Sequence, residues 1–306
     1  EEPTGPAVLL LSVDGAMAPL VGGEWAEVKT LALGEVVATP EGPRTTALSY
    51  FSRLADAATF GQLATLETHR RGTTRAGTVA AVTDGAAWCQ GFLDLHRPDA
   101  VRILDFPHAV EHLSAAAQTL FGPGTAAASD WLGTQAHRLR HGQETAVVTT
   151  LAERAATERR PEARAVLATT RDYLANRQDQ LRYQAFAAAG YPIGSACVES
   201  ANKLVVEARL KGAGMHWARD RVNPLLALRC LLANGRWANE WPGLWLTLRA
   251  AARRSSAPRD PAPGPVPPPR RPSPPAISGS RAKTIVNGRP TADHPWKRGF
   301  TTRAKS

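Results

Sequence analysis

Three apolar runs, each ending close to an aspartate, limit what this chain can fold into. They are PAVLLLSVDGAM (residues 6–17), GTVAAVTDGAAW (77–88) and DAVRILD (99–105). Runs that are apolar at successive positions are typical of strands buried on both faces, as in sheets that helices cover. We therefore expect a mixed α/β layer architecture.

The segments around these runs complete the predicted order of elements. Residues 24–37 alternate well enough to form a strand, and a short strand is expected near 45–48. Apolar residues recur at helical spacing from 49 to 69, and Arg70-Arg71-Gly72 is typical of a helix end. With a further helix that ends near His96, the predicted order is three strands, a helix, a strand, a helix and a strand.

Residues 108–190 differ in character from the first part of the chain. They are rich in Ala, Leu and Arg at helical spacing and contain no strand-like run, which predicts a block of four or five helices. A further helix is expected to start at Gly194-Ser195 and to stop at Gly212. The predicted parts are, in chain order, a first core part, a helical insertion, a second core part, a Pro-rich linker and a basic tail: 1–107, 108–190, 191–252, 253–280 and 281–306.

The positive charge of the chain is concentrated at its C-terminal end. The net charge is +10, but residues 253–306 hold 12 of the 37 Lys and Arg residues and two of the 27 acidic ones. The preceding residues carry 25 side chains of each sign and are neutral. We expect the tail to bind DNA nonspecifically and with a strong dependence on salt.

The cysteines and the apolar runs bear on the compartment. The three cysteines form no C-x-x-C pair, so neither a disulfide framework nor a cysteine zinc site is predicted. No apolar run approaches the roughly 18 residues of a membrane span, and the first residues lack the basic start of a signal peptide. We expect a cytoplasmic protein without membrane contact. Because the chain starts without Met and enters a strand-like run almost at once, we also expect an upstream segment to be missing.

Four acidic residues are candidates for a functional site. Asp14, Asp84 and Asp105 follow the three apolar runs, and ligands of an open α/β sheet collect where strands end. Asp-Gly after a strand is also ordinary turn chemistry, and this alternative stays open for any single one of them. Glu199 falls in the first turn of a predicted helix, where it can face the sheet or simply complement the helix dipole.

Carboxylates from two neighbouring strands and one helix suit two Mg²⁺ or Mn²⁺ ions in phosphoryl transfer. Strand spacing decides which aspartates can share the ions. If the strand of Asp84 pairs with that of Asp14, the two ends lie about 4.8 Å apart, whereas Asp105, one strand further out, is about 10 Å from Asp14. Asp14, Asp84 and Glu199 are then the predicted ligands, and Asp105 belongs to an outer position.

The stretch RILDFPHAVEHL offers a different metal site. His108, Glu111 and His112 have the H-x-x-E-H spacing of a zinc site on a helix, and Pro107 permits a helix to start there. A zinc hydrolase is therefore an alternative. It requires a third ligand, however, and it leaves the aspartates after the other two strands without a role.

Several motifs together resemble one protein family. They are SVDGAM, EWAEVKTLALG, VTDGAAW, ILDFPHAVEHL, LRYQAFAAAGYPIGSACVESANKLVVEARLKGAGMHW and RPTADHPWKRGF, in this order. In this combination the chain resembles bacterial insertion-sequence transposases of the Mutator-like DDE group, close to the ISKra type, over nearly its whole length. The resemblance implies an RNase H-like mixed sheet with a helical insertion before the last catalytic helix.

The resemblance assigns roles residue by residue. It implies a catalytic triad of Asp14 in VDG, Asp84 in TDG and Glu199 in VES, which binds two Mg²⁺ or Mn²⁺ ions. Asp105 and His108 match the C/D-x-x-H pattern of the group and become accessory residues, with Asp105 as the alternative second member of the triad. His108 then either orients a scissile phosphate or a carboxylate, or is a structural histidine. The implied activity is metal-dependent cleavage at transposon ends followed by strand transfer to target DNA.

The resemblance also implies the partners. These are transposon ends and target DNA, with a homo-oligomer assembled on the DNA and a nucleoid-associated location. Members of the group usually carry an N-terminal region that binds the ends of the element, and this chain begins almost at the first catalytic strand. A truncated, inactive DNA-binding remnant of a transposase is therefore the main alternative.

Basic and aromatic side chains near the predicted site are candidate DNA contacts, with a solvated or structural role as the alternative for each. They are Arg70, Arg71, Arg209, Lys211, His216 and Trp217. Trp237, Trp241 and Trp245 recur at helical spacing, but Pro242 is expected to interrupt the helix. For these tryptophans core packing is favoured over stacking on bases.

Overall fold

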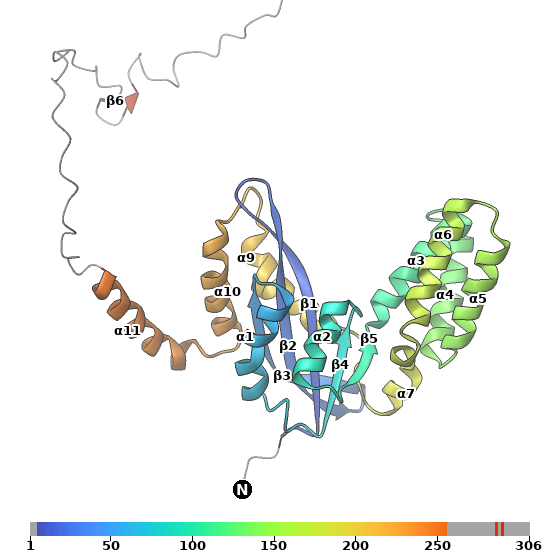
Figure 1. The fold of residues 1–306 in the computed structure, drawn as a ribbon, viewed down its shortest axis with the longest axis horizontal. Coiled ribbons are helices and arrows are strands. Elements are labelled where there is room, and N and C mark those ends of the chain that lie inside the picture. The colour runs from blue at the N-terminus through green and yellow to red at the C-terminus, as the bar shows by residue number, and fades with distance from the viewer. Residues whose placement is uncertain (1–4, 256–284, 287–288, 291–306) are drawn as a thin grey trace, which may run out of the picture. The chain divides into compact units, whose positions relative to one another are not determined.

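A five-stranded mixed sheet lies at the centre of the fold (Figure 1), which was obtained as a computed structural model describing residues 5–255, 285–286 and 289–290. The strand order is β3-β2-β1-β4-β5. Strand β2 runs antiparallel to both of its neighbours, β1 and β3, whereas β4 and β5 run parallel to β1. The strands are β1 Val8–Pro19, β2 Trp25–Thr39, β3 Gly42–Arg53, β4 Thr78–Thr83 and β5 Val101–Leu104. The mixed α/β architecture expected from the sequence is confirmed.

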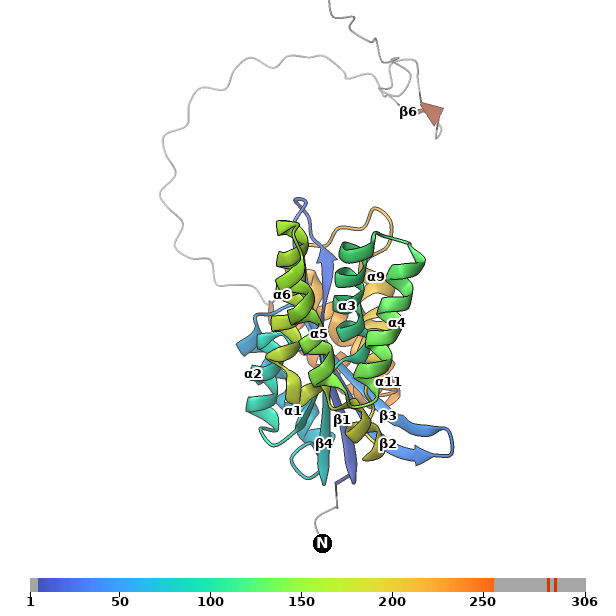
Figure 2. The same ribbon diagram turned by 90° about the vertical axis from the view of Figure 1, so that its right-hand side faces the viewer.

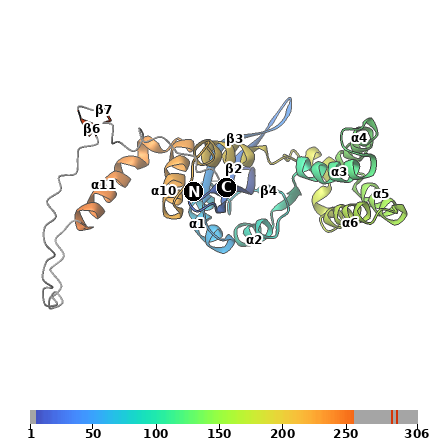
Figure 3. The ribbon, with the colours of Figure 1, turned by 90° about the horizontal axis from the view of Figure 1, so that it is seen from above.

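Helices cover both faces of this sheet (Figure 3). Because side chains alternate across a strand, Leu9 and Leu11 of β1 pack on the face that carries Phe60, while Ala16 and Ala18 pack on the opposite face. The first face is covered by α1 Ala57–Arg70 and α2 Ala87–His96. The second is covered by α8 Ala196–Ala201, the π-helical segment η2 Asn202–Glu207, α9 Ala208–Leu210 and α10 Arg219–Ala233.

A helical bundle is inserted between β5 and α8 (Figure 2). Its apolar stripes, including Leu113, Leu151 and Leu167, form one core with Ile103 and Leu104 at the end of β5. The bundle is thereby anchored where the parallel strands stop. Its elements are α3 Phe106–Phe121, α4 Ala126–Arg140, α5 Glu144–Thr157, α6 Pro161–Ala175, the 3-10 turn η1 Gln178–Leu181 and α7 Tyr183–Ala188.

The helix predicted from residue 49 begins later. Residues up to Arg53 belong to β3, and α1 starts after Asp56, whose side chain accepts a hydrogen bond from the Thr59 amide. The helical spacing of apolar residues was misleading because one buried position of β3 carries a polar residue, Ser52. Its hydroxyl is satisfied across the sheet by Thr30, at 2.9 Å.

The tryptophan segment forms one helix, α11 Trp237–Ser255, and Pro242 lies within it. The expected interruption is therefore wrong: Pro242 removes only the hydrogen bond to the carbonyl four residues earlier, close to the helix start. The preference for core packing is also wrong, because Trp237 and Trp245 are 38% and 48% exposed. Both rings stack on Trp241, with centroids 4.6 and 6.1 Å away.

The chain divides into two compact units, residues 1–249 and 250–306. Both predicted core parts, up to residue 249, and the insertion lie in the first unit. In the second, β6 Ile285–Val286 pairs antiparallel with β7 Arg289–Pro290. Most of the predicted linker and basic tail lies outside the described residues. Within the described part of the chain, no helix has the length and apolarity that crossing a bilayer requires.

Candidate active site

Three neighbouring strands bring their aspartates to one end of the sheet. Leu11 of β1 pairs with Ala81 of β4, so the same register carried three residues further sets Asp14 beside Asp84. Thr83 pairs with Leu104 of β5, so one residue further Asp84 lies beside Asp105. The order of strands assumed for the spacing argument is therefore found. Strand β1, however, does not end at Asp14 but continues to Pro19, paired with β2 alone.

Asp14 lies just beyond the point where β1 stops pairing with β4, and both of its carboxylate oxygens accept hydrogen bonds. Oδ1 accepts the Gly15 amide at 2.7 Å, and Oδ2 accepts Nδ2 of Asn202 at 2.7 Å. Burial raises the pKa of Asp14 above its usual value, and the negative charges of Asp84 and Glu199 raise it further, while the hydrogen bonds act in the opposite direction. The three carboxylates therefore repel one another at this point.

Asp84 is held in the turn between β4 and α2. Its Oδ1 accepts the Ala86 amide at 2.8 Å and the Cys89 thiol at 3.4 Å. Burial, together with the negative charge of Asp84, raises the pKa of the Cys89 thiol well above its usual range. The thiol therefore stays protonated and acts as a donor to the carboxylate.

Glu199 is supplied by α8 and lines the same cavity as the aspartates. Its Oε1 accepts the hydroxyl of Ser195, the residue at the helix start, at 3.1 Å. The helix then widens into the π-helical segment η2, a form that occurs mostly as short bulges, frequently at functional sites. The first residue of that segment is Asn202, which is 5% exposed. Its Nδ2 binds Asp14, and its Oδ1 has no partner among the described residues.

These side chains surround a cavity of about 220 Å³. It is lined by Val13, Asp14, Asp84, Asp105, Pro107, His108, Glu111, Ser195, Val198 and Glu199. In the described part of the chain, none of its strand-end aspartates, nor Glu199, forms an ion pair with Lys or Arg. The result is a concentration of negative charge without a cation of its own.

A second hollow, of about 360 Å³, continues from this cavity along the far half of β1. It shares Asp14 and Glu199 with the first cavity and adds Lys203 and Lys211. Lys211 is bound to Glu207 at 2.6 Å, whereas Lys203 is exposed and makes no ion pair in the described chain. We call this second hollow the lysine groove. Its lining thus includes two lysines as well as Asp14 and Glu199, although neither lysine forms an ion pair with those two carboxylates in the described chain.

The donor set of the cavity fits Mg²⁺ or Mn²⁺. Carboxylate oxygens are the ligands that these ions prefer, and Asp14, Asp84 and Glu199 offer them without a competing cation. Among the described residues, no three His, Cys, Asp or Glu side chains are arranged to hold one ion by themselves. Mg²⁺ is commonly held by one or two protein carboxylates, with water and substrate phosphates completing its shell.

Both carboxylate oxygens of Asp105 accept hydrogen bonds from backbone amides. Its Oδ2 accepts the amide of His108 and caps α3, at 3.0 Å, and its Oδ1 accepts the amide of Ser195 at 2.7 Å. The side chain is 4% exposed, and burial raises its pKa despite both hydrogen bonds. Asp105 therefore ties the end of β5 and the start of α3 to the start of α8, while it also lines the cavity.

The H-x-x-E-H residues lie on α3 without forming a zinc set. His108 lines the cavity and contacts Glu111 at 3.4 Å, and its ring meets that of His112 edge-on, with centroids 5.0 Å apart. His112 instead stacks on Tyr173 of α6, with ring centroids 3.9 Å apart. No third ligand completes a site with these histidines in the described residues.

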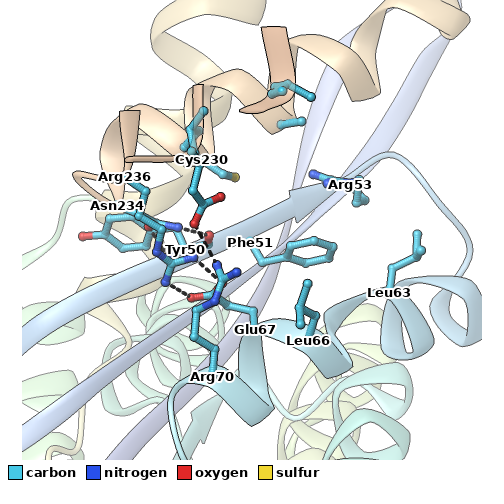
Figure 4. A pocket seen from close by; sticks show the side chains of 14 residues that line it. Tyr50, Phe51, Arg53, Leu63, Leu66, Glu67, Arg70, Cys230, Asn234 and Arg236 are labelled. Carbon is cyan, nitrogen blue, oxygen red and sulfur yellow. Dashed lines mark hydrogen bonds and ion pairs between the residues drawn. The ribbon is translucent and has the colours of Figure 1, made fainter. Parts of the chain in front are cut away.

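Arg70 and Arg71 are not brought to the carboxylates. Arg70 lies in a separate pocket between α1, β3, α10 and α11, where it contacts Glu67 and Glu240 at 3.6 and 3.3 Å (Figure 4). Arg71 donates to the Ala47 carbonyl at 2.6 Å and lies 3.6 Å from Glu35. Both arginines are engaged in contacts with other parts of the chain, and neither lines the cavity.

The other predicted DNA contacts lie on α9 or in the segment that follows it. Lys211 lines the lysine groove, whereas Arg209 lies over the ring of Trp217, 5.6 Å from its centroid. Trp217 pairs through its backbone with Pro19 and Val21, and its indole donates to Leu210 at 3.3 Å. His216 contacts the Leu20 carbonyl at 3.3 Å. Trp217 and His216 thus hold the segment after α9 against the end of β1.

No family model and no curated protein sequence matches the chain. The transposase resemblance therefore depends on the quoted motifs alone.

Sequence reasoning missed Asn202 and Lys203, although Asn202 follows Glu199 by three residues, the spacing that places two side chains on one helix face. It also missed Tyr173 and Arg177, which lie in the insertion and have no local motif that marks them.

Proposed function

We propose that this chain is a DDE transposase that catalyses metal-dependent DNA strand cleavage and strand transfer. One observation carries the proposal: Asp14, Asp84 and Glu199, from three separate elements, line one cavity in which no Lys or Arg of the described chain pairs with them. Like charges held together in this way are costly unless cations or a reaction make use of them.

The sheet supports the proposal at the level of the fold. The order β3-β2-β1-β4-β5, in which β2 is antiparallel to both β1 and β3 while β4 and β5 are parallel to β1, is compatible with the RNase H-like arrangement that the resemblance implies. The helical bundle between β5 and α8 occupies the place of the implied insertion. Strand order and carboxylate register thus favour the same family.

The roles of the side chains follow from their positions. Asp14 and Asp84 would hold one Mg²⁺ or Mn²⁺ ion, and Asp14 and Glu199 a second. When bound, such ions lower the pKa of a bound water and stabilise charge on the attacking and leaving oxygens. Asn202 fixes the carboxylate of Asp14, and Ser195 fixes that of Glu199.

The proposed reaction has two phosphoryl-transfer steps. Water attacks the phosphorus at the transposon end, the P–O3′ bond breaks, and the oxygen leaves as a 3′-hydroxyl. That hydroxyl then attacks a phosphodiester of the target, which releases a target 3′-hydroxyl, so bonds balance and no redox partner is required. His108, which lines the cavity, would orient the scissile phosphate. Lys203 and Lys211 in the lysine groove would bind neighbouring phosphates.

We further propose that the protein acts as a homo-oligomer on transposon ends and target DNA. A nucleoid-associated, cytoplasmic location would follow from these partners. An inactive remnant that only binds DNA is the rival, because all the carboxylates can persist after catalysis is lost. Activity, rather than binding, separates the two.

The test is cleavage of end-labelled duplexes that contain the DNA flanking the gene, with Mg²⁺ or Mn²⁺. We expect metal-dependent nicks whose 3′ ends a polymerase can extend. Asp14→Asn, Asp84→Asn and Glu199→Gln should each reduce nicking to background while DNA binding persists. Glu153→Gln, at an exposed carboxylate of α5, is the matched control and should cleave normally. Wild-type protein that binds these duplexes but never nicks them would identify the remnant instead.

A further inference from the structure

The backbone of the turn that carries Asp84 accepts hydrogen bonds from side chains of the helical insertion. The hydroxyl of Tyr173, on α6, donates to the backbone carbonyl of Asp84 at 2.6 Å. Arg177, just after α6, donates through Nη2 to the carbonyl of Gly85 at 2.8 Å and through Nε at 3.3 Å. Two side chains from a distant part of the chain therefore hold two successive carbonyls. We call this pair the Tyr173–Arg177 clamp.

The backbone of the turn is shaped for this contact. Gly85 has a φ of +76°, a left-handed conformation that side chains disfavour, and a Cβ there would lie 2.4 Å from Nε of Arg177. On the other side of the turn, the Asp84 carboxylate accepts the Ala86 amide at 2.8 Å. The peptide between β4 and α2 is thus fixed both by its own carboxylate and by the clamp.

The clamp is itself held rigidly. Arg177 lies over the ring of Tyr173, 4.1 Å from its centroid, and donates to the Tyr173 carbonyl at 3.0 Å. The ring of Tyr173 also stacks on that of His112 of α3, with ring centroids 3.9 Å apart and an interplanar angle of 20°. The ring of Tyr173, itself on α6, is thus also held by α3, the helix that starts at the end of β5.

We propose that Tyr173 and Arg177 are positioning residues that set Asp84 relative to Asp14, so that the helical insertion takes part in assembling the carboxylate site. This inference rests on the proposed function. General packing does not account for the contacts, because the Tyr173 hydroxyl and two of the three guanidinium nitrogens of Arg177 are directed at the backbone of residues 84–85. Tyr183, in contrast, buries a hydroxyl that has no partner in the described chain.

The test compares conservative variants with matched controls from the same bundle. Tyr173→Phe removes only the hydroxyl and keeps the ring stack, and Arg177→Lys keeps the charge but loses the fork. Tyr183→Phe and Arg171→Lys, the latter at an exposed ion pair with Asp172, are the controls. Hydrogen–deuterium exchange is measured over residues 84–90 in the full chain without metal or DNA. Cleavage rate and DNA affinity are then measured separately.

We expect exchange over residues 84–90 to rise about fivefold in each clamp variant, as for the loss of one hydrogen bond. The cleavage rate should fall while DNA affinity stays unchanged, and both controls should behave as wild type. Unchanged exchange, or wild-type cleavage by both clamp variants, would overturn the inference. Failure of the wild-type protein to cleave would instead refute the proposed function, and the exchange result would still show whether the clamp holds the turn.

Discussion

Replacing Asp105 with alanine should destabilise the protein more than any ordinary helix-cap substitution. The side chain satisfies two backbone donors at once, the His108 amide that starts α3 and the Ser195 amide before α8. Loss of an N-cap costs about 1 kcal/mol, and a buried amide left without a partner costs about 1–3 kcal/mol. Because burial already raises the pKa of Asp105, its ionised form is itself somewhat disfavoured, which lowers the expected loss to about 2–3 kcal/mol.

For a chain of this size that loss corresponds to a fall in melting temperature of roughly 5–10 °C. Thermal unfolding followed by circular dichroism measures it. Asp56→Ala is the matched control, since Asp56 caps α1 in the same way but is exposed and serves no second element, so the fall should be much smaller. An Asp105→Ala protein that melts like wild type yet has lost all cleavage would refute this reasoning. It would make Asp105, rather than Asp84, the second catalytic acid.

Three further predictions concern charge. Asp14→Asn should raise the melting temperature at pH 7 and not at pH 3.5: the pKa of Asp14 is raised above 3.8, so its charge penalises the fold only above that pH. Lys203→Ala should weaken DNA binding and reduce the slope of log affinity against log salt by about one, and an unchanged slope would exclude a phosphate contact. Arg236→Ala should lower the free energy of unfolding, measured by chemical denaturation, by about 3 kcal/mol, because buried Glu67 loses both hydrogen bonds from Arg236 and keeps only the longer contact with Arg70. Adding Glu67→Gln should recover part of that loss.

The parts of the fold that the sequence predicted are those with strong local patterns. The continuous apolar runs before Asp14, Asp84 and Asp105 identified buried strands, and the strand pairing assumed for the spacing argument is the one found. The strand predicted near residues 45–48 was shorter than β3 because the apolar pattern is broken by buried Ser52, whose partner Thr30 is remote in sequence. Long-range pairing of polar side chains leaves no period in the local sequence.

The sequence singled out the acidic residues that line the cavity, but not the residues that hydrogen-bond to them. Asn202 contacts Asp14 across 188 positions of sequence, and Tyr173 reaches Asp84 across 89. Such contacts are fixed by the docking of whole elements, so neither residue type nor spacing marks them in advance. The opposite error occurred with Arg70 and Arg71, where closeness in sequence to the strands did not mean closeness to the site, because α1 ends away from it.

Anomalous diffraction from crystals soaked in Mn²⁺ tests most directly whether Asp14, Asp84 and Glu199 form one metal site. The predicted result is a manganese peak at about 2.1 Å from carboxylate oxygens of Asp14 and Asp84, with a second peak near Glu199 when DNA is bound. Asp14→Asn crystals should lose both peaks. Manganese bound instead by His108 and His112, or no peak in the cavity with DNA present, would contradict the account.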